Sequence, residues 1–478
     1  MARMAADVCT CRAPHADSVT FAAITQKDEF MLRFTRWGRM VFASLIALAI
    51  LPLPLTHGQE SGPEAVAQAM VDNLIAEDYE AAIADFDETM ASLMPVSVTQ
   101  QTWESILAQV GAYQDQLAIQ SQEVEEYTVV VITLQFERAV IDVQVSVNGS
   151  GKIGGLYFRP GQAPQPDWEP PAYADPSAFT ERDITLNAGT DWELPGTLTL
   201  PNGDGPFPAV ALVHGSGPND RDESIGPNKV FRDLAWGLAS NGIAALRYDK
   251  HTRIHGQAMA GQPELTVQEE TIDDALAAAA LLRDTDGIDP QRVFVLGHSL
   301  GGYLAPRIAA QTDSLAGLIL LAGNTRPLEV LTLEQVDYLL SLDGELSEDE
   351  QAQLEALAAE VEQLQTLDDT VDPSTTVLDI PAAYWLDLRG YDPVAVAQTL
   401  DIPMLILQGE RDYQVTMVDF QGWQDGLAGH ENVTFNSYPD LNHLFISGEG
   451  PSAPAEYEQP GHVAGAVLGD ITSWILSH

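Results

Sequence analysis

The sequence predicts an α/β protein in which a mostly parallel, eight-stranded sheet covered by helices follows a small α+β domain. Strand and helix patterns alternate from residue 181 to the C-terminus. The run from Val293 to Leu296 is apolar at every position, which indicates a strand buried on both faces, as in parallel sheets under helices. The chain has 478 residues, of which 45% are apolar, so it can bury a core in more than one domain.

The second domain is predicted to span residues 181–478. Strands are expected at residues 183–187, 193–200, 208–213, 243–248, 292–297, 317–321, 404–408 and 434–438. Helices between them include residues 229–240 and 267–282.

One interval of this domain departs from the alternation. No strand is expected between Gly323 and Asp401, whereas Ser347 and Glu350 form a capping box that begins a helix. This helix carries one apolar stripe, made of Leu354, Leu357, Val361 and Leu364. A coiled-coil surface would need about 3–4 heptads, and about two are present. We therefore expect an inserted helical cap over residues 324–395.

The first domain is predicted to span residues 61–160, with helices at 65–86 and 100–110. Strands are expected at 127–136, 139–147 and 153–158, with a turn at 148–151. Repeated prolines then indicate a linker over residues 161–180. No set of catalytic residue types stands out in the first domain, so we expect an accessory role.

The charge balance excludes several functions. The chain has 22 Lys and Arg against 70 Asp and Glu, a formal net charge of −48. Such a chain lacks the cations that bind nucleic acid or an anionic membrane surface. An acidic, lysine-poor surface suits high salt, or simply a secreted protein. No metal-ligand cluster and no phosphate-binding loop followed by lysine is recognisable, so neither a cofactor nor a nucleotide is expected.

The N-terminal residues 1–60 are predicted to hold a secretory signal. Arg33, Arg36 and Arg39 precede an apolar run over 41–55, which is shorter than the ~20 residues of a membrane span. We expect export, to the outside of the cell or to its envelope; an uncleaved anchor is the alternative, and would be the chain's one link to a membrane. Both cysteines, Cys9 and Cys11, lie here, which leaves the folded domains without a disulfide or a catalytic cysteine.

The segment Gly297-His298-Ser299-Leu300-Gly301 matches the pattern G-x-S-x-G. It follows the strand predicted at 292–297 and precedes a predicted helix, which is the strand–turn–helix context that exposes a nucleophilic serine. We therefore predict Ser299 as the nucleophile.

An acid and a base follow in the order that this nucleophile requires. Asp412 comes just after the strand 404–408, and His443 lies in a loop after the last strand. His443 would act as the general base, and Asp412 would orient its ring. Glu410 and Asp419 are the alternative acids. The competing histidines are His214, His251, His255, His298, His430 and His462, of which His214 and His298 are expected to pack or hydrogen-bond beside other motifs.

Two backbone N–H groups are predicted to form an oxyanion hole. Leu300 follows the nucleophile directly and supplies one donor. The second is expected from the loop His214-Gly215-Ser216-Gly217, most simply from Ser216, with Gly217 as the alternative.

These motifs resemble the α/β-hydrolase superfamily, in its bacterial esterase and serine-aminopeptidase-like branch. The matching segments are 214–222, 247–250, 297–302, 408–412 and 442–443. Relatives continue Tyr-Asp-Lys-Arg-Gly, whereas here Lys250 is followed by His251, Thr252 and Arg253. Residues 61–160 resemble the small DUF3887 domain that precedes secreted bacterial hydrolases. The resemblance implies an α/β-hydrolase fold and action on short or medium acyl esters.

A serine nucleophile implies an acyl-enzyme that water then cleaves. Hydrolysis of small carboxylic esters is therefore the leading function. The alternatives are a serine aminopeptidase or thioesterase on the same fold, and a non-catalytic binding protein. Residues that bind substrate are not identified by the sequence.

Overall fold

The computed structural model describes residues 62–478, apart from 125, 162, 164–167, 260–261, 263, 345, 369, 373–374 and 379. The predicted signal or anchor therefore lies outside the described residues. Among the helices that are described, none combines the length and the apolar character needed to cross a membrane.

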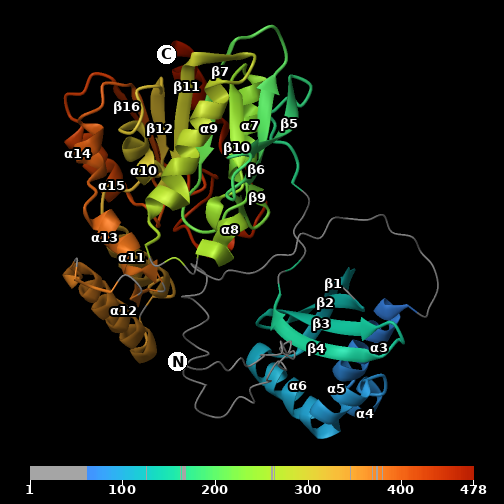
Figure 1. Cartoon of the computed structure of the whole chain (residues 1–478). Coiled ribbons are helices and arrows are strands. Elements are labelled where there is room, and N and C mark those ends of the chain that lie inside the picture. The colour runs from blue at the N-terminus through green and yellow to red at the C-terminus, as the bar shows by residue number, and fades with distance from the viewer. Residues whose placement is uncertain are drawn as a thin grey trace, which may run out of the picture. The chain divides into compact units, whose positions relative to one another are not determined.

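A four-stranded antiparallel sheet forms the first folded part, with strand order β1-β2-β3-β4. Its strands are β1 (Tyr113–Val124), β2 (Tyr127–Phe136), β3 (Val140–Asn148) and β4 (Ile153–Pro160). The helices are α3 (Pro63–Ile75), α4 (Tyr79–Ala82), α5 (Glu88–Leu93) and α6 (Val96–Val110). They lie on one side of the sheet (Figure 1), where Trp103 and Phe136 belong to the shared core.

One expectation for this part was wrong, and one strand was not predicted. The helix predicted at 65–86 is broken, because Glu77 takes a left-handed φ of 60° and α4 then begins with its own cap, Asp78. The backbone N–H of Ala81 donates to the Asp78 carboxylate at 3.1 Å. The strand β1 was missed because it is mostly polar and lies at the sheet edge, so it lacks the alternating apolar pattern.

The second part is built on an eight-stranded sheet, ordered β16-β15-β12-β11-β7-β10-β6-β5. Its strands are β5 (Phe179–Leu186), β6 (Leu194–Pro201), β7 (Phe207–Val213), β10 (Ala244–Tyr248), β11 (Ile288–His298), β12 (Gly317–Leu321), β15 (Met404–Gly409) and β16 (Val433–Tyr438). Only β6 pairs antiparallel, with β5 and with β10; the other pairs are parallel. The predicted fold class is confirmed.

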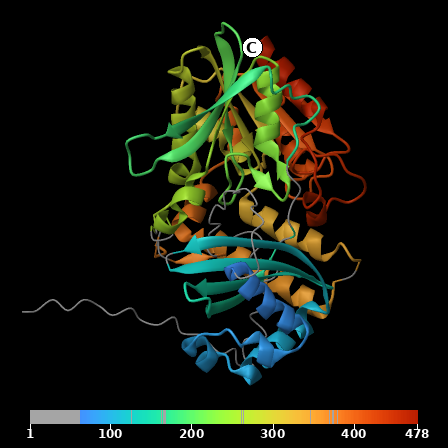
Figure 2. The ribbon, with the colours of Figure 1, turned by 90° about the vertical axis from the view of Figure 1, so that its right-hand side faces the viewer.

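Helices cover both faces of this sheet (Figure 2). One face packs against α9 (Asp273–Arg283), α10 (Leu300–Ala309) and α15 (Met417–Gly426). The other packs against α7 (Val230–Ser240) and α17 (Gly465–Ser477). The helix expected at 267–282 is present as a continuous helical run, which starts as the π-helical turn η1 (Gln268–Ile272) and continues directly as α9. A helix that was not predicted, α8 (His251–Met259), follows β10. Short elements β8 (Ser224–Ile225), β9 (Asn228–Lys229) and α16 (Pro454–Tyr457) complete the connections.

Among the described residues between β12 and β15, where an inserted cap was predicted, there are four helices. They are α11 (Leu328–Leu340), α12 (Glu348–Thr366), α13 (Ala382–Arg389) and α14 (Pro393–Ala397). The expectation of no strand here was wrong, because β13 (Thr376–Val377) and β14 (Ile380–Pro381) form a small hairpin. The capping box of Ser347 and Glu350 is present at the start of α12. Val361 and Leu364 from the apolar stripe are buried, and Leu364 packs with Trp385 of α13.

Candidate active site

The turn between β11 and α10 carries Ser299. Its φ of 52° is left-handed, which is strained for a residue with a side chain and is typical of a nucleophile at a strand-to-helix turn. Small neighbours allow the turn, because a Cβ on Gly301 would overlap the carbonyl oxygen of Val213. The N–H of Ser299 donates to the carbonyl of Leu321 at 2.9 Å, which ties the turn to the adjacent strand β12.

Asp412 and His443 lie together after the ends of β15 and β16. Nδ1 of His443 is 2.7 Å from Oδ2 of Asp412, and both residues are buried. The other carboxylate oxygen of Asp412, Oδ1, accepts the backbone N–H groups of Gln414 at 2.8 Å and Val415 at 3.0 Å. Nε2 of Gln408 donates to Oδ2 at 3.1 Å. The carboxylate is thus held from both sides, with one oxygen directed at the imidazole.

The two alternative acids are engaged elsewhere. Glu410, which follows β15, is exposed and accepts a hydrogen bond from Ser437 of β16 at 2.8 Å. Asp419 is fully buried and pairs with Arg326, at 2.7 Å between Oδ2 and Nη2. Within the described part of the chain neither of them forms a hydrogen bond or an ion pair with His443, whereas Asp412 does.

His298 connects the serine turn to the loop of His443. Its Nε2–H donates to the carbonyl oxygen of His443 at 2.9 Å, and the two rings lie 4.8 Å apart. Its Nδ1 is 3.0 Å from Oε2 of Glu223, deep inside the protein. Burial is the largest single influence on the pKa of His298 and lowers it, but the charge and hydrogen bond of Glu223, the carbonyl of His443 and the charge of Asp412 together raise this pKa above the usual value. His298, the residue before the predicted nucleophile, therefore helps to hold the loop of the predicted base.

Glu223 also holds the loop that follows β7. Its Oε1 accepts the N–H of Gly215 at 2.7 Å. Burial opposes ionisation of Glu223, but the nearby His298 and His214 and the N–H of Gly215 together hold the pKa of this carboxyl below the usual value. One buried carboxylate thus joins the serine turn to the loop 214–217.

The loop 214–217 lies against Ser299. A Cβ built on Gly215 would come 3.1 Å from the Cβ of Ser299, so a side chain at this position would crowd the serine. His214 donates from Nε2 to the carbonyl of Asp220 at 3.0 Å, and burial lowers its pKa to about 4. Ser216 comes next in the loop, while Leu300 is the first residue of α10, where backbone N–H groups lack intrahelical acceptors. The two predicted oxyanion donors therefore come from segments adjacent to Ser299.

The remaining histidines serve other contacts. His251 pairs with Asp274 at 3.0 Å, His255 bonds to the carbonyl of Glu193, and His462 pairs with Asp233 at 3.1 Å. The backbone N–H of His430 donates to Leu427.

Sequence reasoning missed a buried chain of polar groups beside the loop 214–217. Nζ of Lys250 donates to the carbonyl of Gly215 at 2.8 Å and lies 2.8 Å from Oε1 of Glu270. The hydroxyl of Tyr384 donates to Oε2 of Glu270 at 2.6 Å. The only available signal was Lys250 itself, which stands in the motif Arg-Tyr-Asp-Lys at a strand end in a lysine-poor chain.

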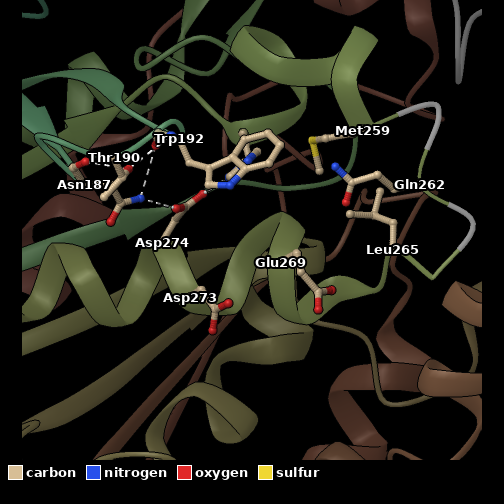
Figure 3. Close-up of a pocket in the computed structure, with 10 residues that line it drawn as sticks. Asn187, Thr190, Trp192, Met259, Gln262, Leu265, Glu269, Asp273 and Asp274 are labelled. Carbon is tan, nitrogen blue, oxygen red and sulfur yellow. Dashed lines mark hydrogen bonds and ion pairs between the residues drawn. The ribbon is translucent and has the colours of Figure 1, made fainter.

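A cavity of about 340 Å³ lies between the β5–β6 turn and the segment from α8 to α9. In Figure 3, Trp192 lies above the helix that carries Asp274, and Asn187 bonds to this carboxylate at 2.8 Å. Its lining consists of Asn187, Thr190, Trp192, His251, Met259, Gln262, Leu265, Glu269, Asp273 and Asp274. None of the three predicted catalytic residues is among them.

Across the described parts of the chain, no three His, Cys, Asp or Glu side chains are grouped as metal ligands.

Comparison with known proteins agrees with this architecture. The model of a hydrolase family described as serine aminopeptidase, S33, matches residues 208–449. The chain belongs to this hydrolase family. A second model, a domain of unknown function named DUF3887, matches residues 67–156. Both predicted resemblances are confirmed, and so is the prediction that the protein is a hydrolase.

The chain is also similar to named proteins. It is 41% identical to Esterase EstD of Thermotoga maritima over 406 residues, which are 85% of this chain and 93% of the esterase. Among solved structures, Est1E from Butyrivibrio proteoclasticus is 15% identical, with a TM-score of 0.39 over 62% of this chain and 98% of Est1E. A puromycin-hydrolyzing peptidase of Mycobacterium tuberculosis is 18% identical, with a TM-score of 0.41 over 76% of this chain and 47% of the peptidase.

Proposed function

We propose that the protein hydrolyses small carboxylic esters through a Ser299–His443–Asp412 triad and an acyl-enzyme. The observation that carries this proposal is the buried 2.7 Å contact between His443 and Asp412, in a loop that His298 ties to the serine turn. The substrate class is supported by the similarity to an esterase over most of both chains.

The contacts of His443 define its role in this mechanism. Because Nδ1 faces the carboxylate of Asp412, that nitrogen carries the proton and Nε2 is left to accept one. Nε2 takes the proton of Ser299 as its Oγ attacks the ester carbonyl carbon, and Asp412 stabilises the imidazolium that forms. The imidazolium then returns the proton to the leaving alcohol.

The developing negative charge on the carbonyl oxygen needs fixed donors. The N–H groups of Leu300 and Ser216 would supply them, since both segments adjoin Ser299. Water, activated by His443, then attacks the acyl-enzyme and releases the acid. By resemblance to this branch of the family, short or medium acyl groups are the proposed substrates.

Aminopeptidase activity is a second candidate because of the description of the family model that matches half of the chain. The same triad and acyl-enzyme would serve an amide, but a pocket for the substrate's free amine would be needed in addition.

A paired assay separates the two candidates. Hydrolysis of p-nitrophenyl esters with acyl chains of increasing length is compared with that of aminoacyl p-nitroanilides, at low and high salt. We expect ester turnover in the wild type and none above background in Ser299→Ala. Faster turnover of the anilides would favour the aminopeptidase, and unchanged turnover in Ser299→Ala would refute the nucleophile.

We also propose that the protein is exported, because a basic flank and a short apolar run occupy residues 33–55. Fractionation of cells that express the full chain would test this. Recovery of the chain in the cytoplasm alone would refute export, and recovery in the membrane fraction would indicate the uncleaved anchor.

A further inference from the structure

The ammonium group of Lys250 is buried next to the predicted oxyanion loop, although the proposed reaction does not use it. The residue is only 2% exposed. Burying a charge is costly unless it is paired and hydrogen-bonded, and here Glu270 and the carbonyl of Gly215 satisfy both needs at 2.8 Å each. A pair of hydrocarbon side chains could fill the same space, so this arrangement calls for a functional explanation.

The carbonyl that Lys250 binds belongs to the same peptide group as the N–H of Ser216. A peptide group is planar, and this one is trans, so its carbonyl and its N–H point in opposite directions. Whatever fixes the carbonyl of Gly215 therefore also fixes the direction of the Ser216 N–H. Nδ2 of Asn219 supports the carbonyl at 3.2 Å, while Glu223 holds the other side of Gly215 through its N–H.

A cation on this carbonyl also changes the strength of the donor. Hydrogen bonds in a chain polarise one another, so an ammonium on the carbonyl oxygen makes the N–H of the same peptide a stronger donor. An oxyanion binds best to donors that are already oriented and cannot turn away. Lys250 lies on the carbonyl side of this peptide group, where an ammonium favours both effects.

Glu270 extends this chain of contacts to the inserted helices. One of its oxygens pairs with Lys250, and the other accepts the hydroxyl of Tyr384 at 2.6 Å. Tyr384 lies on α13, and Glu270 lies in the π-helical turn η1. The chain Tyr384–Glu270–Lys250–Gly215 therefore links a helix of the insertion to the oxyanion loop through buried side chains.

We propose that Lys250 is a positioning residue, which orients the Ser216 N–H toward the oxyanion and is itself held by Glu270 and Tyr384. This inference rests on the proposed function, since it assigns a task within the same hydrolytic site. It predicts that loss of Lys250 weakens transition-state binding and leaves ground-state binding almost unchanged.

The test compares Lys250→Met with the wild type on the best p-nitrophenyl ester. We expect kcat to fall about 10- to 100-fold, as for a displaced donor, and KM to stay within about twofold. A trifluoromethyl ketone with the same acyl chain, which forms an oxyanion on the serine, should lose affinity in parallel with kcat/KM. An unchanged kcat in a folded Lys250→Met protein would overturn the proposal.

Lys250→Met leaves Glu270 without its cation, which can prevent folding, so two milder variants keep the proposal testable. Tyr384→Phe should lower kcat about 3- to 10-fold, and combining it with Lys250→Met should lower kcat no further, because both act through one peptide group. Tyr391→Phe is the matched control, since its hydroxyl donates to a backbone carbonyl, that of Tyr303, at 2.8 Å and does not enter this chain. Equal losses in kcat for Tyr384→Phe and Tyr391→Phe would refute the special role of Tyr384.

Hydrogen exchange provides a readout that needs no substrate. Amide exchange in a peptide that covers residues 214–219 should be faster in Lys250→Met and Tyr384→Phe than in the wild type and Tyr391→Phe. Unchanged exchange would overturn the positioning role even if the wild type hydrolysed no ester. A wild type without ester activity but with the expected exchange pattern would refute the proposed function alone.

Discussion

The surroundings of Asp412 predict a large effect for the conservative change Asp412→Asn. An asparagine here has to keep its carbonyl oxygen toward the backbone N–H groups of Gln414 and Val415. The reverse orientation would leave both donors unpaired, at a cost of about 1–3 kcal/mol for the buried N–H of Val415. Its NH₂ group then faces Nδ1 of His443. The imidazole, unlike the backbone, can change its tautomer, so its proton moves to Nε2.

The Nε2–H tautomer cannot accept the proton of Ser299. We therefore expect kcat to fall roughly 10³- to 10⁴-fold, the range known for a base held in the wrong tautomer, which corresponds to about 4–5.5 kcal/mol of transition-state stabilisation. KM should change little, because the ester need not contact Asp412. The assay is the steady-state hydrolysis of p-nitrophenyl butyrate at pH 7–8, with folding verified by urea unfolding.

Asp419→Asn is the control, because Asp419 is another buried aspartate that accepts backbone and side-chain donors. It should destabilise the protein by about 3–5 kcal/mol through the loss of its pair with Arg326, while kcat stays within about threefold. A kcat for Asp412→Asn within tenfold of the wild type would refute the tautomer argument. A loss of kcat in Asp419→Asn but not in Asp412→Asn would indicate that Asp419 is the acid that orients His443.

Three further changes test how the site is held. In His214→Gln, the unfolding free energy should depend less on pH between pH 4 and 6.5. The unfolded wild type binds a proton at His214 near pH 6.5, whereas the folded one does so only near about 4, so the wild type loses about 3 kcal/mol of stability as the pH falls through this range. Urea unfolding at several pH values measures this difference. Glu223→Gln should lower the unfolding free energy by about 3–5 kcal/mol near pH 6, and by less at pH 9. The raised pKa of His298 makes its pair with Glu223 stabilising below about pH 6.5, and this contribution disappears as the pH rises through the folded pKa of His298. An equal loss at both pH values would contradict the charged pair. Gly301→Ala should prevent expression of folded protein, since its Cβ meets the Val213 carbonyl; a stable, active variant would show that the turn can shift.

Features set by neighbouring residues were predictable from the sequence. The serine turn depends on an apolar strand, two glycines and a following helix, all within about a dozen residues. The capping box at Ser347 and Glu350 is equally local, because a helix start needs only its own first turn. The order of strands and helices, and with it the fold, follows from the same short-range patterns. The failures had local causes too, since the left-handed Glu77 and the polar edge strand β1 have no hydrophobic signature.

The arrangement of charges required the tertiary structure. Asp412, Glu410 and Asp419 are all acids near the end of one strand, and only packing decides which of them meets His443, more than 20 residues away. Glu270 contacts both Lys250 and Tyr384, and Tyr384 lies 114 residues further along the chain than Glu270. Buried ionised groups are not solvated by water, so each needs a group of opposite charge or a hydrogen-bond partner, and the tertiary fold determines which residue this is. The sequence thus determined which chemical groups exist and which backbone turns carry them, whereas the packing of distant segments decided which groups act together.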